Sequence, residues 1–549
     1  MGAFIPSRFY ALALCVLACI AAAIASLVWP WLGVPAIIFA ALTGIGIWDL
    51  RQTRHAIRRN YPILAHFRFF FEYIRPEIRQ YFIESDTEAT PFSRNQRSIV
   101  YQRAKQQLDK RPFGTPNNVY ATGYEWMNHS MSPTRVGSSD FRNKIGVLPD
   151  GTLKPGVTQP YSASVFNISA MSFGALSANA VRALNEGARR GGFAHDTGEG
   201  SISRYHRENG GDLIWEIGSG YFGCRNPDGS FSEENFVKNA THSQVKMIEI
   251  KLSQGAKPGH GGVLPGVKVS IEIAEARGVA VGQDCISPAA HSAFGSPIEM
   301  MQFIERLRGL SGGKPVGFKL CIGHPWEFFA LAKAMLATGV TPDFIVIDGK
   351  EGGTGAAPVE FSDHVGTPLS EGLQLAHNTL VGLNLRDRVY LGASGKIITA
   401  FDIARTMALG ADWCNSARGF MFALGCIQSQ SCHTDRCPTG VTTQNALRQR
   451  ALVVPDKAER VYQFHRQTLA ALAELVAAAG LTHPSEISPD HIVRRVSQHE
   501  VRLLSTLAQF VRPGSLLEGR FEQTVFERYW PMARPDSFLA AQVNSVPSP

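Results

Sequence analysis

Two long apolar stretches without a charged residue stand near the start of the chain. They cover residues 9–29 and 31–48 and are separated only by Pro30. A helix needs roughly 20 apolar residues to cross the hydrocarbon core of a bilayer, so both stretches are long enough to span. A signal peptide has a shorter apolar region and is not followed at once by a second one. A buried core helix is the other alternative, and we favour a transmembrane helical hairpin over residues 1–50.

Basic residues flank this predicted hairpin and are missing from its turn. Arg8 precedes the first stretch, and four arginines follow the second: Arg51, Arg54, Arg58 and Arg59. Because positive residues stay on the cytoplasmic side of a membrane, both ends of the hairpin should be cytoplasmic. We therefore expect the chain in the cell inner membrane, with the domain that follows the hairpin facing the cytoplasm.

Between residues 161 and 419, short β-rich apolar runs alternate with helical stretches. This alternation predicts an α/β fold, a closed (β/α)8 TIM barrel, and about 250 residues is the usual length for that fold. An open doubly wound sheet is the alternative, but no G-x-G-x-x-G sequence follows the first strand. The predicted strands are 164–169, 192–196, 247–251, 282–286, 316–321, 344–348, 389–392 and 413–416, and the predicted helices include 179–190, 297–310, 326–338, 369–383 and 400–409.

Length and composition set the remaining organisation. The 549 residues, 44% hydrophobic and 18% charged, are typical of a large globular protein. The net charge of +8 is not gathered into basic blocks, which argues against nucleic-acid binding. The aromatic segment 51–114 either lies on the membrane surface or packs under the barrel. The predicted divisions are a hairpin (1–50), a linker and pre-barrel segment (51–150), the barrel with a cysteine cluster (151–450) and a helical C-terminal extension (451–549) with helices at 458–479 and 489–510.

Three of the nine cysteines lie close together in the sequence. Cys426, Cys432 and Cys437 have the spacing C-x5-C-x4-C, and a proline follows the last of them. Thiolates at loop spacing before a proline are typical of an iron–sulfur site, and three ligands suit a cluster that lacks one iron. Zinc with His433 as a fourth ligand is the main alternative. The other six cysteines are scattered, which argues against a disulfide framework.

Glycine-rich or polar loops follow most of the predicted strands. In a barrel such loops meet at one mouth, where catalytic residues gather and phosphates bind to backbone N–H groups. The loop after strand 247–251 carries Lys257 between glycines, which suits an anionic ligand. Lys319 lies inside an apolar strand, a position that costs free energy unless the charge is paired. These loops, at residues 170–177, 196–200, 251–262, 348–357, 392–396 and 417–419, predict a phosphorylated cofactor at the barrel mouth.

Five of these motifs together resemble the FMN-binding synthase domain of glutamate synthases, in a stand-alone and membrane-anchored form. They are residues 171–177, 197–200, 254–259 and 352–356 and the cysteine loop, in the family's order. The resemblance covers about residues 115–450. It implies an oxidoreductase of the glutamate synthase type, in which electrons pass from a 3Fe–4S cluster to FMN. The enzyme would reduce the imine formed from 2-oxoglutarate and ammonia, giving glutamate.

The resemblance also assigns roles to individual residues. The cluster ligands would be Cys426, Cys432 and Cys437. The keto acid would be held at a catalytic set of Gln254, Lys257 and Arg277, with Glu199 nearby. The residues around FMN would be Ser172, Lys319, Gly353, Thr354, Ser394, Gly395, Arg418 and Gly419.

Departures from the family bear on the substrate more than on the cofactors. The amidotransferase domain of the large glutamate synthases has no counterpart here, so we expect free ammonia, or ammonia from another subunit, and an external electron donor such as a ferredoxin. His260 stands where an acidic residue is usual, and residues 392–395 replace a Gly-Gly pair. Two alternatives stay open. An amine could replace ammonia and give an N-alkyl glutamate, or FMN and the cluster could serve only as a membrane-bound electron relay.

Overall fold

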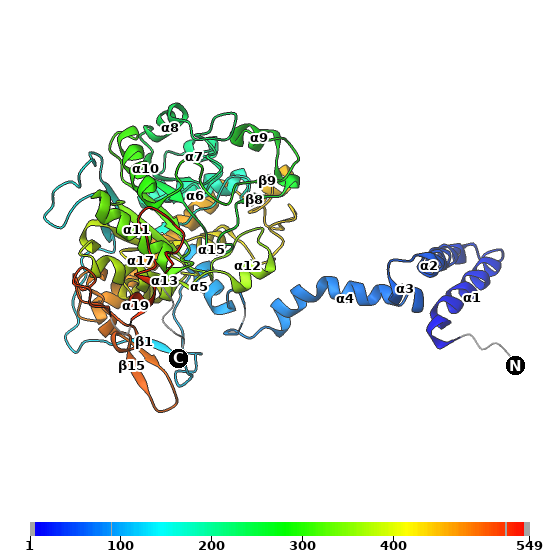
Figure 1. Cartoon of the computed structure of the whole chain (residues 1–549). Helices are drawn as coiled ribbons and strands as arrows, with labels where there is room; N and C mark the ends of the chain where they lie inside the picture. Colours follow the sequence, from blue (N-terminus) through cyan, green and yellow to red (C-terminus); the bar gives the residue numbers. More distant parts are fainter. Residues whose placement is uncertain (1–5, 89, 522–523, 543–549) are drawn as a thin grey trace. The chain divides into compact units, whose positions relative to one another are not determined.

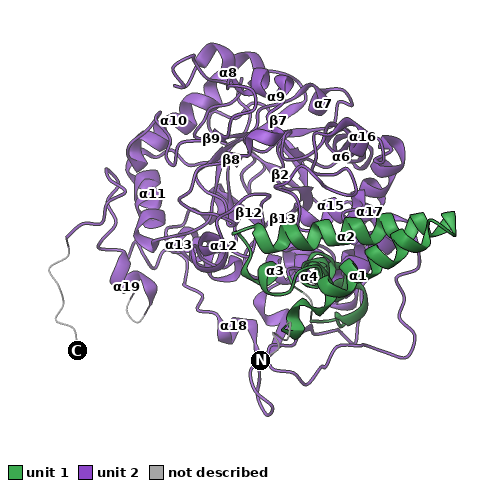
Figure 2. Ribbon diagram, turned by 90° about the vertical axis from the view of Figure 1, so that its right-hand side faces the viewer, with its two compact units in different colours: residues 1–90 green, residues 91–549 purple. Residues whose placement is uncertain are grey.

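The computed structural model describes residues 6–88, 90–521 and 524–542 (Figure 1). The chain forms two compact units, residues 1–90 and residues 91–549 (Figure 2). The predicted segment 51–150 is therefore divided, because its first part belongs to the unit that holds the apolar stretches and its second part to the unit that holds the barrel.

The first unit begins with the two apolar helices that the sequence predicts. The helical stretch Ser7–Ala25 contains α1 (Tyr10–Ala25), and Pro30–Arg51 contains α2 (Gly33–Arg51), with mean hydropathies of 2.2 and 1.8. At most 6% of either apolar window is buried within the structure. The two helices pack closely, since a Cβ on Gly46 would lie against Leu12 and Ile63. Both are long and apolar enough to cross a membrane.

Contacts with the buried carboxylate of Asp49 fix the segment that follows α2. The segment comprises α3 (Ala56–Asn60), α4 (Ala65–Ile78) and one π-helical turn at Arg79–Ile83. Asp49, fully buried near the end of α2, accepts a hydrogen bond from the N–H of Ile63 at 3.0 Å and lies 2.9 Å from Nε2 of His66. The aromatic side chains that α4 exposes are Phe67, Phe70, Phe71 and Tyr73.

Eight parallel strands of the second unit close into the predicted barrel. Helices surround these strands (Figure 2), as the alternation of strand and helix requires. In barrel order the strands are β4 (Phe166–Ile168), β5 (His195–Asp196), β6 (Leu213–Ile217), β7 (Val245–Lys251), β10 (Val316–Leu320), β11 (Phe344–Asp348), β12 (Tyr390–Ser394) and β13 (Trp413–Ser416). The helices of this unit are α5 (Arg94–Ala104), α6 (Ala178–Gly191), α7 (Arg204–Arg207), α8 (Glu233–Ala240), α9 (Ile271–Arg277), α10 (Pro297–Leu310), α11 (Pro325–Thr338), α12 (Val359–His364), α13 (Leu369–Gly382), α14 (Ala400–Ala408), α15 (Arg418–Leu424), α16 (Ala446–Gln449), α17 (Val454–Ala478), α18 (Leu504–Leu507) and α19 (Val525–Tyr529).

One predicted barrel strand is wrong, and one barrel strand was missed. The run 282–286 yields only β9 (Cys285–Ile286), which pairs antiparallel with β8 (Val263–Leu264) in an insertion between β7 and α10. The missing strand is β6, which lies between β5 and β7. All five residues of β6 are buried although Glu216 is among them. That charge in an apolar run hid the strand from a search for continuous hydrophobicity.

The C-terminal extension is partly helical. The long helix α17 confirms the prediction at 458–479, but the prediction at 489–510 is wrong. There β14 (Ile492–Arg495) and β15 (Val501–Leu503) form a hairpin, and β14 pairs antiparallel with β1 (Glu125–Met127). Pairing with a strand far away in the sequence overrides the local helical pattern in this segment.

The barrel interior is apolar at one end and charged at the other. At the amino ends of the strands, the hairpin of β2 (Arg142–Ile145) and β3 (Tyr161–Ser164) supplies side chains to an apolar cluster. Its barrel members include Ile214, Met247, Phe344, Val346 and Trp413. Nearer the carboxyl ends, the buried side chains are Asp196, Glu216, Glu249 and Lys319. Since buried charges need a specific reason, chemistry is expected at the carboxyl ends.

Candidate active site at the barrel mouth

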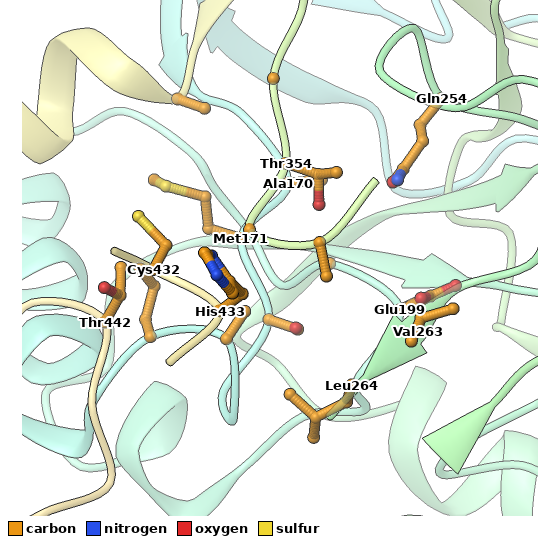
Figure 3. A pocket seen from close by; sticks show the side chains of 18 of the residues that line it. Ala170, Met171, Glu199, Gln254, Val263, Leu264, Thr354, Cys432, His433 and Thr442 are labelled. Carbon is orange, nitrogen blue, oxygen red and sulfur yellow. The ribbon is translucent and has the colours of Figure 1, made fainter. Parts of the chain in front are cut away.

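Two adjoining cavities open among the loops at the carboxyl ends of the barrel strands. The larger encloses about 910 Å³ not filled by protein atoms, and the smaller about 680 Å³. Because several residues line both, the cavities form one continuous site. The shared residues are Ala170, Gln254, Gly353, Thr354, Ala417 and Arg418. In Figure 3 the larger cavity lies between Cys432 and His433 on one side and Glu199 and Val263 on the other.

Two buried cations in the larger cavity lack a carboxylate partner. Lys257 is 2% exposed, and its ammonium group has no ion pair or hydrogen bond with any described residue. Burial lowers the pKa of Lys257 to about 8, although the nearby charge of Glu199 acts in the opposite direction. Arg277, 4% exposed, donates to the carbonyl of Phe173 at 3.1 Å, while its Nε finds no partner among the described atoms. Unpaired buried cations are costly, so the cavity is suited to an anion.

The carboxylate of Glu199 is already paired. Its Oε2 lies 2.9 Å from Nζ of Lys251, a lysine at the end of β7. Burial acts to raise the pKa of Glu199, but Lys251, Arg277 and Lys257 outweigh it and hold that pKa below its ordinary value. Glu199 is therefore ionised at neutral pH and fixes Lys251, which leaves Lys257 and Arg277 to a ligand.

A tight turn holds Gln254 at the boundary of the two cavities (Figure 3). The N–H of Gly255 donates to Oδ2 of Asp348 at 2.7 Å. A Cβ on Gly255 would overlap the carbonyl oxygen of Gly349, so no larger residue fits there without moving the turn. The sequence between β7 and α9 is thus anchored on the loop after β11.

The smaller cavity presents backbone donors and cations to a ligand. Within the part of the chain that the structure describes, the N–H groups of Gly395, Lys396 and Ile397 have no acceptor in the protein. Lys396 adopts a left-handed backbone with φ of 52°, which turns this segment sharply. Arg418, without a carboxylate partner among the described residues, lines the same cavity. Successive free N–H groups beside cations are suited to a phosphate.

Lys319 lies at the floor of the smaller cavity and is paired, as its position in an apolar strand required. It is 3% exposed, forms an ion pair with Glu216, and its Nζ is 3.0 Å from Oε1 of Glu249. These carboxylates outweigh the effect of burial and hold the pKa of Lys319 well above its ordinary value. The lysine is therefore charged whenever the site is empty.

The cysteine loop follows α15 and brings one thiol to the larger cavity. Cys432 lines that cavity, and the charges of Cys432 and Cys437 act on Cys426, so the three thiols are neighbours. Burial acts to raise the pKa of Cys437, but hydrogen bonds from Thr439 and Thr442 lower it below its ordinary value. Lys268 donates to the carbonyl of Cys432 at 3.4 Å and places a cation beside the loop. These contacts favour the thiolate of Cys437, as a metal cluster requires, whereas burial raises the pKa of Cys426 to about 11.

Most predicted site residues meet at these cavities. Those that line one or both are Glu199, Gln254, Lys257, Arg277, Ser172, Lys319, Gly353, Thr354, Ser394, Gly395, Arg418 and Cys432. Gly419 lines neither and is buried at the start of α15, where a Cβ would press on Ser416 and Phe464. The sequence search missed Lys268, Glu216 and Glu249, and it placed Lys251, Lys396 and Asp196 in the mouth loops without giving them a role. A search for charged residues within apolar runs, the signal that identified Lys319, would have identified Glu216 and Glu249 as well.

A closed parallel barrel with a cationic site at its carboxyl-end mouth defines the class of (β/α)8-barrel enzymes. Residues 139–482 match the model of the conserved region in glutamate synthase. The chain is 38% identical over 517 residues to the glutamate synthase large subunit-like protein YerD of Bacillus subtilis, covering 87% of this chain and 97% of that protein. It is 31% identical over 408 residues to the archaeal-type glutamate synthase (NADPH) of Thermotoga maritima, covering 72% and 77% respectively.

The chain therefore belongs to the glutamate synthase family, as the motif resemblance indicated. It is an oxidoreductase of the glutamate synthase type. A third relative, the archaeal glutamate synthase (NADPH) of Methanocaldococcus jannaschii, is 35% identical over 315 residues, covering 57% of this chain and 58% of that protein.

Proposed function

We propose that this chain is a membrane-anchored glutamate synthase that reduces the imine formed from 2-oxoglutarate and ammonia. One observation carries the proposal. The larger cavity holds two buried cations without a carboxylate partner among the described residues, Lys257 and Arg277, next to a second cavity suited to a phosphorylated cofactor. A dicarboxylate needs two fixed cations, and a purely electron-transferring protein needs neither.

FMN is the cofactor that the smaller cavity fits. The free N–H groups of Gly395, Lys396 and Ile397, with Arg418, would hold its phosphate. Lys319 and the small residues Gly353 and Ala170 would lie beside its ring. When bound, FMN supplies hydride transfer to an electron-poor carbon. The permanent charge of Lys319 then stabilises negative charge on the ring, which accounts for a lysine kept at the barrel floor.

The residues of the larger cavity would bind and orient the keto acid. Lys257 and Arg277 would each bind a carboxylate, and Gln254 offers an amide to the same space. Glu199, paired with Lys251, would repel a second carboxylate from its own side. Bound in this way, the keto acid would present its reacting carbon between the two cavities, and such positioning contributes a large part of catalysis in many enzymes.

An iron–sulfur cluster on Cys426, Cys432 and Cys437 would accept single electrons from an external donor and pass them on. A ferredoxin is one such donor. The support is the lowered pKa of Cys437, the cation of Lys268 and the proximity of Cys432 to the larger cavity. A three-iron cluster needs three thiolates, which is the number this loop offers.

The test is a turnover assay with the purified full-length chain under anaerobic conditions. We expect flavin absorption and iron in the protein, and reoxidation of the reduced flavin when 2-oxoglutarate and ammonia are added together, with glutamate formed. A panel of primary amines in place of ammonia separates an N-alkyl glutamate synthase from a glutamate synthase. If neither an oxo acid nor an amine reoxidises the reduced flavin, the chain serves only as an electron relay.

Replacing Cys432 by serine should remove the cluster and keep the flavin. We expect iron to be lost and turnover with a protein electron donor to fall more than about 100-fold, because a missing ligand exceeds the usual effect of outer-shell changes. Iron analysis and visible spectra measure this. Cys321→Ser is the control, since that buried thiol points to the carbonyl of Thr367, outside the cysteine loop. Equal iron in both variants contradicts the assigned ligands.

We propose that α1 and α2 span the cell inner membrane, with the barrel on the cytoplasmic side. The two helices are exposed and apolar, and arginines flank them while their turn carries no charge. The exposed aromatic side chains of α4 are suited to the headgroup layer of the same membrane.

Truncation tests this anchor at two positions. A chain lacking residues 1–90, the whole first unit, should be soluble and keep its cofactors, since the second unit has its own core. A chain lacking only residues 1–51 loses both proposed spans, so we expect it to leave the membrane fraction as well. If it still sediments with vesicles, α1 and α2 are not the anchor. If the chain lacking residues 1–90 also sediments, the membrane contact lies in the barrel unit.

A further inference from the structure

Five charged groups gather inside the barrel directly beneath the two cavities. They come from adjacent strands: Asp196 from β5, Glu216 from β6, Glu249 from β7, Lys319 from β10 and Asp348 from β11. The first four are at most 3% exposed. Neither the binding of an oxo acid nor that of a phosphate uses the three carboxylates of Asp196, Glu216 and Glu249.

These three carboxylates lie very close to one another. One oxygen from each falls within 4.8 Å of the others. Lys319 pairs with Glu216 and lies 3.0 Å from Oε1 of Glu249. Oδ2 of Asp196 and Oε2 of Glu249 are buried and have no hydrogen-bond partner among the described residues. Each of these two residues therefore has an unused, buried acceptor.

The charges cannot all be present at once. Four ionised carboxylates and one ammonium would leave a net charge of 1 − 4 = −3. Because Asp196, Glu216 and Glu249 are buried, such a charge is costly and is reduced by binding protons. A proton bound by Asp196 or Glu249 would reduce this charge and give one of the two unpartnered oxygens a hydrogen. A divalent metal is the other possible counter-charge, but the ammonium of Lys319 already lies between Glu216 and Glu249.

The cluster is in contact with both cavities. Glu216 lines the larger one, and Lys319 and Asp348 line the smaller one. A change of charge in either cavity therefore acts on the cluster over a short distance, where electrostatic coupling is strong. Coupled carboxylates of this kind exchange protons as one unit.

We propose that Asp196, Glu216 and Glu249 form a proton-binding site that takes up one proton when two electrons reach the smaller cavity and releases it when they leave. The inference rests on the proposed binding of FMN. With FMN bound, reduction would bring two electrons and one proton to the cofactor, and the carboxylate cluster would bind a second proton. When hydride leaves for the imine with the two electrons and the first proton, the cluster would release the second proton, so charge balances over the cycle.

The resting state of the cluster is consistent with this role. Burial, opposed by Lys319 and reinforced by Glu216, raises the pKa of Glu249 to about 7. Burial likewise raises the pKa of Asp196 well above its ordinary value. Slightly above neutral pH, Glu249 is therefore largely unprotonated and can bind a proton. Added negative charge nearby increases the proton affinity of the cluster.

The experiment measures protons and electrons together in the flavin-loaded full-length chain. The pH dependence of the flavin midpoint potential around pH 8 gives the number of protons bound per two electrons. We expect two for the native chain, and one for Glu249→Gln and for Asp196→Asn, which are isosteric and remove one carboxylate each. Glu234→Gln, an isosteric change on the exposed face of α8, is the matched control and should keep two.

Infrared difference spectra of reduced minus oxidised protein give an independent readout. A carboxylic acid band that appears on reduction, shifts in heavy water and is lost in Glu249→Gln supports the proposal. If that variant does not fold, the same loss in Asp196→Asn decides. The proposal is wrong if the native chain, with flavin bound, takes up only one proton per two electrons and shows no such band. A bound divalent metal that Glu249→Gln removes also overturns it. A chain that binds no flavin contradicts the proposed function itself.

Discussion

Replacing Lys257 by methionine is expected to lower kcat/KM for 2-oxoglutarate by about 100-fold while flavin binding is unchanged. Methionine keeps the length and the apolar contacts of the buried stem but removes the charge that faces the cavity. A charge-assisted hydrogen bond contributes roughly 1.5–3 kcal/mol, and 3 kcal/mol corresponds to about 100-fold. Steady-state kinetics and titration of the oxidised flavin spectrum with the keto acid measure the two effects separately.

The acidity of Lys257 provides a second signature of the same site. Its pKa is lowered to about 8, so the ammonium is charged below that pH and is lost as the pH rises through it. Binding of 2-oxoglutarate should therefore weaken above about pH 8 in the native chain. Lys257→Arg, which stays charged, should bind the keto acid with a flatter pH profile.

Lys350→Met is the control for the charge itself. Lys350 donates to the carbonyl of Ser362 and lines neither cavity, so its loss should leave kcat/KM unchanged. If Lys350→Met and Lys257→Met weaken binding equally, the effect comes from the net charge of the chain, and the assigned carboxylate site is wrong.

Gly255→Ala should be about as damaging as the loss of Lys257, through geometry alone. The added Cβ would overlap the carbonyl oxygen of Gly349, so the turn that carries Gln254 must move away from the loop after β11. A displacement of about 1 Å at a reacting group costs on the order of 100-fold in rate. We expect kcat/KM to fall by about that factor while the thermal unfolding of the barrel shifts little, because the turn lies at the mouth and outside the core.

Gly309→Ala provides the matched comparison. Gly309 lies within α10, where a Cβ meets nothing within 4 Å, and alanine is the better helix former by about 0.5–1 kcal/mol. This variant should unfold at the same or a slightly higher temperature and keep full activity. Full activity in Gly255→Ala would show that the turn can shift without moving Gln254.

The pattern of apolar and polar residues alone was sufficient to predict most of the barrel strands and helices. Seven of the eight strands and the helices α10, α11, α13 and α14 follow from the alternation of apolar runs, because both faces of each strand are buried. The one barrel strand that was missed has a clear cause. Glu216 interrupts the apolar run of β6, and only its partner Lys319, about one hundred residues later, makes that charge acceptable in a core.

Local sequence also determined which residue types meet at the mouth. Glycine-rich turns after parallel strands must converge, so Lys257, Gly395 and Arg418 were predictable as neighbours. Local sequence did not reveal that Glu199 is already paired with Lys251, nor that Gly419 is packed beneath the site. Such distinctions depend on which side chains the fold brings within a few ångströms.

The sequence by itself thus determined the two apolar helices, the parallel barrel and the cysteine spacing, since each is a pattern of neighbours along one chain. Only the tertiary structure decided the hairpin of β14 and β15, the anchored turn at Gly255 and the carboxylate cluster around Lys319. The physical reason is that burial and Coulomb interactions act through space. A charge in an apolar run is an anomaly in the sequence until the fold places its partner beside it.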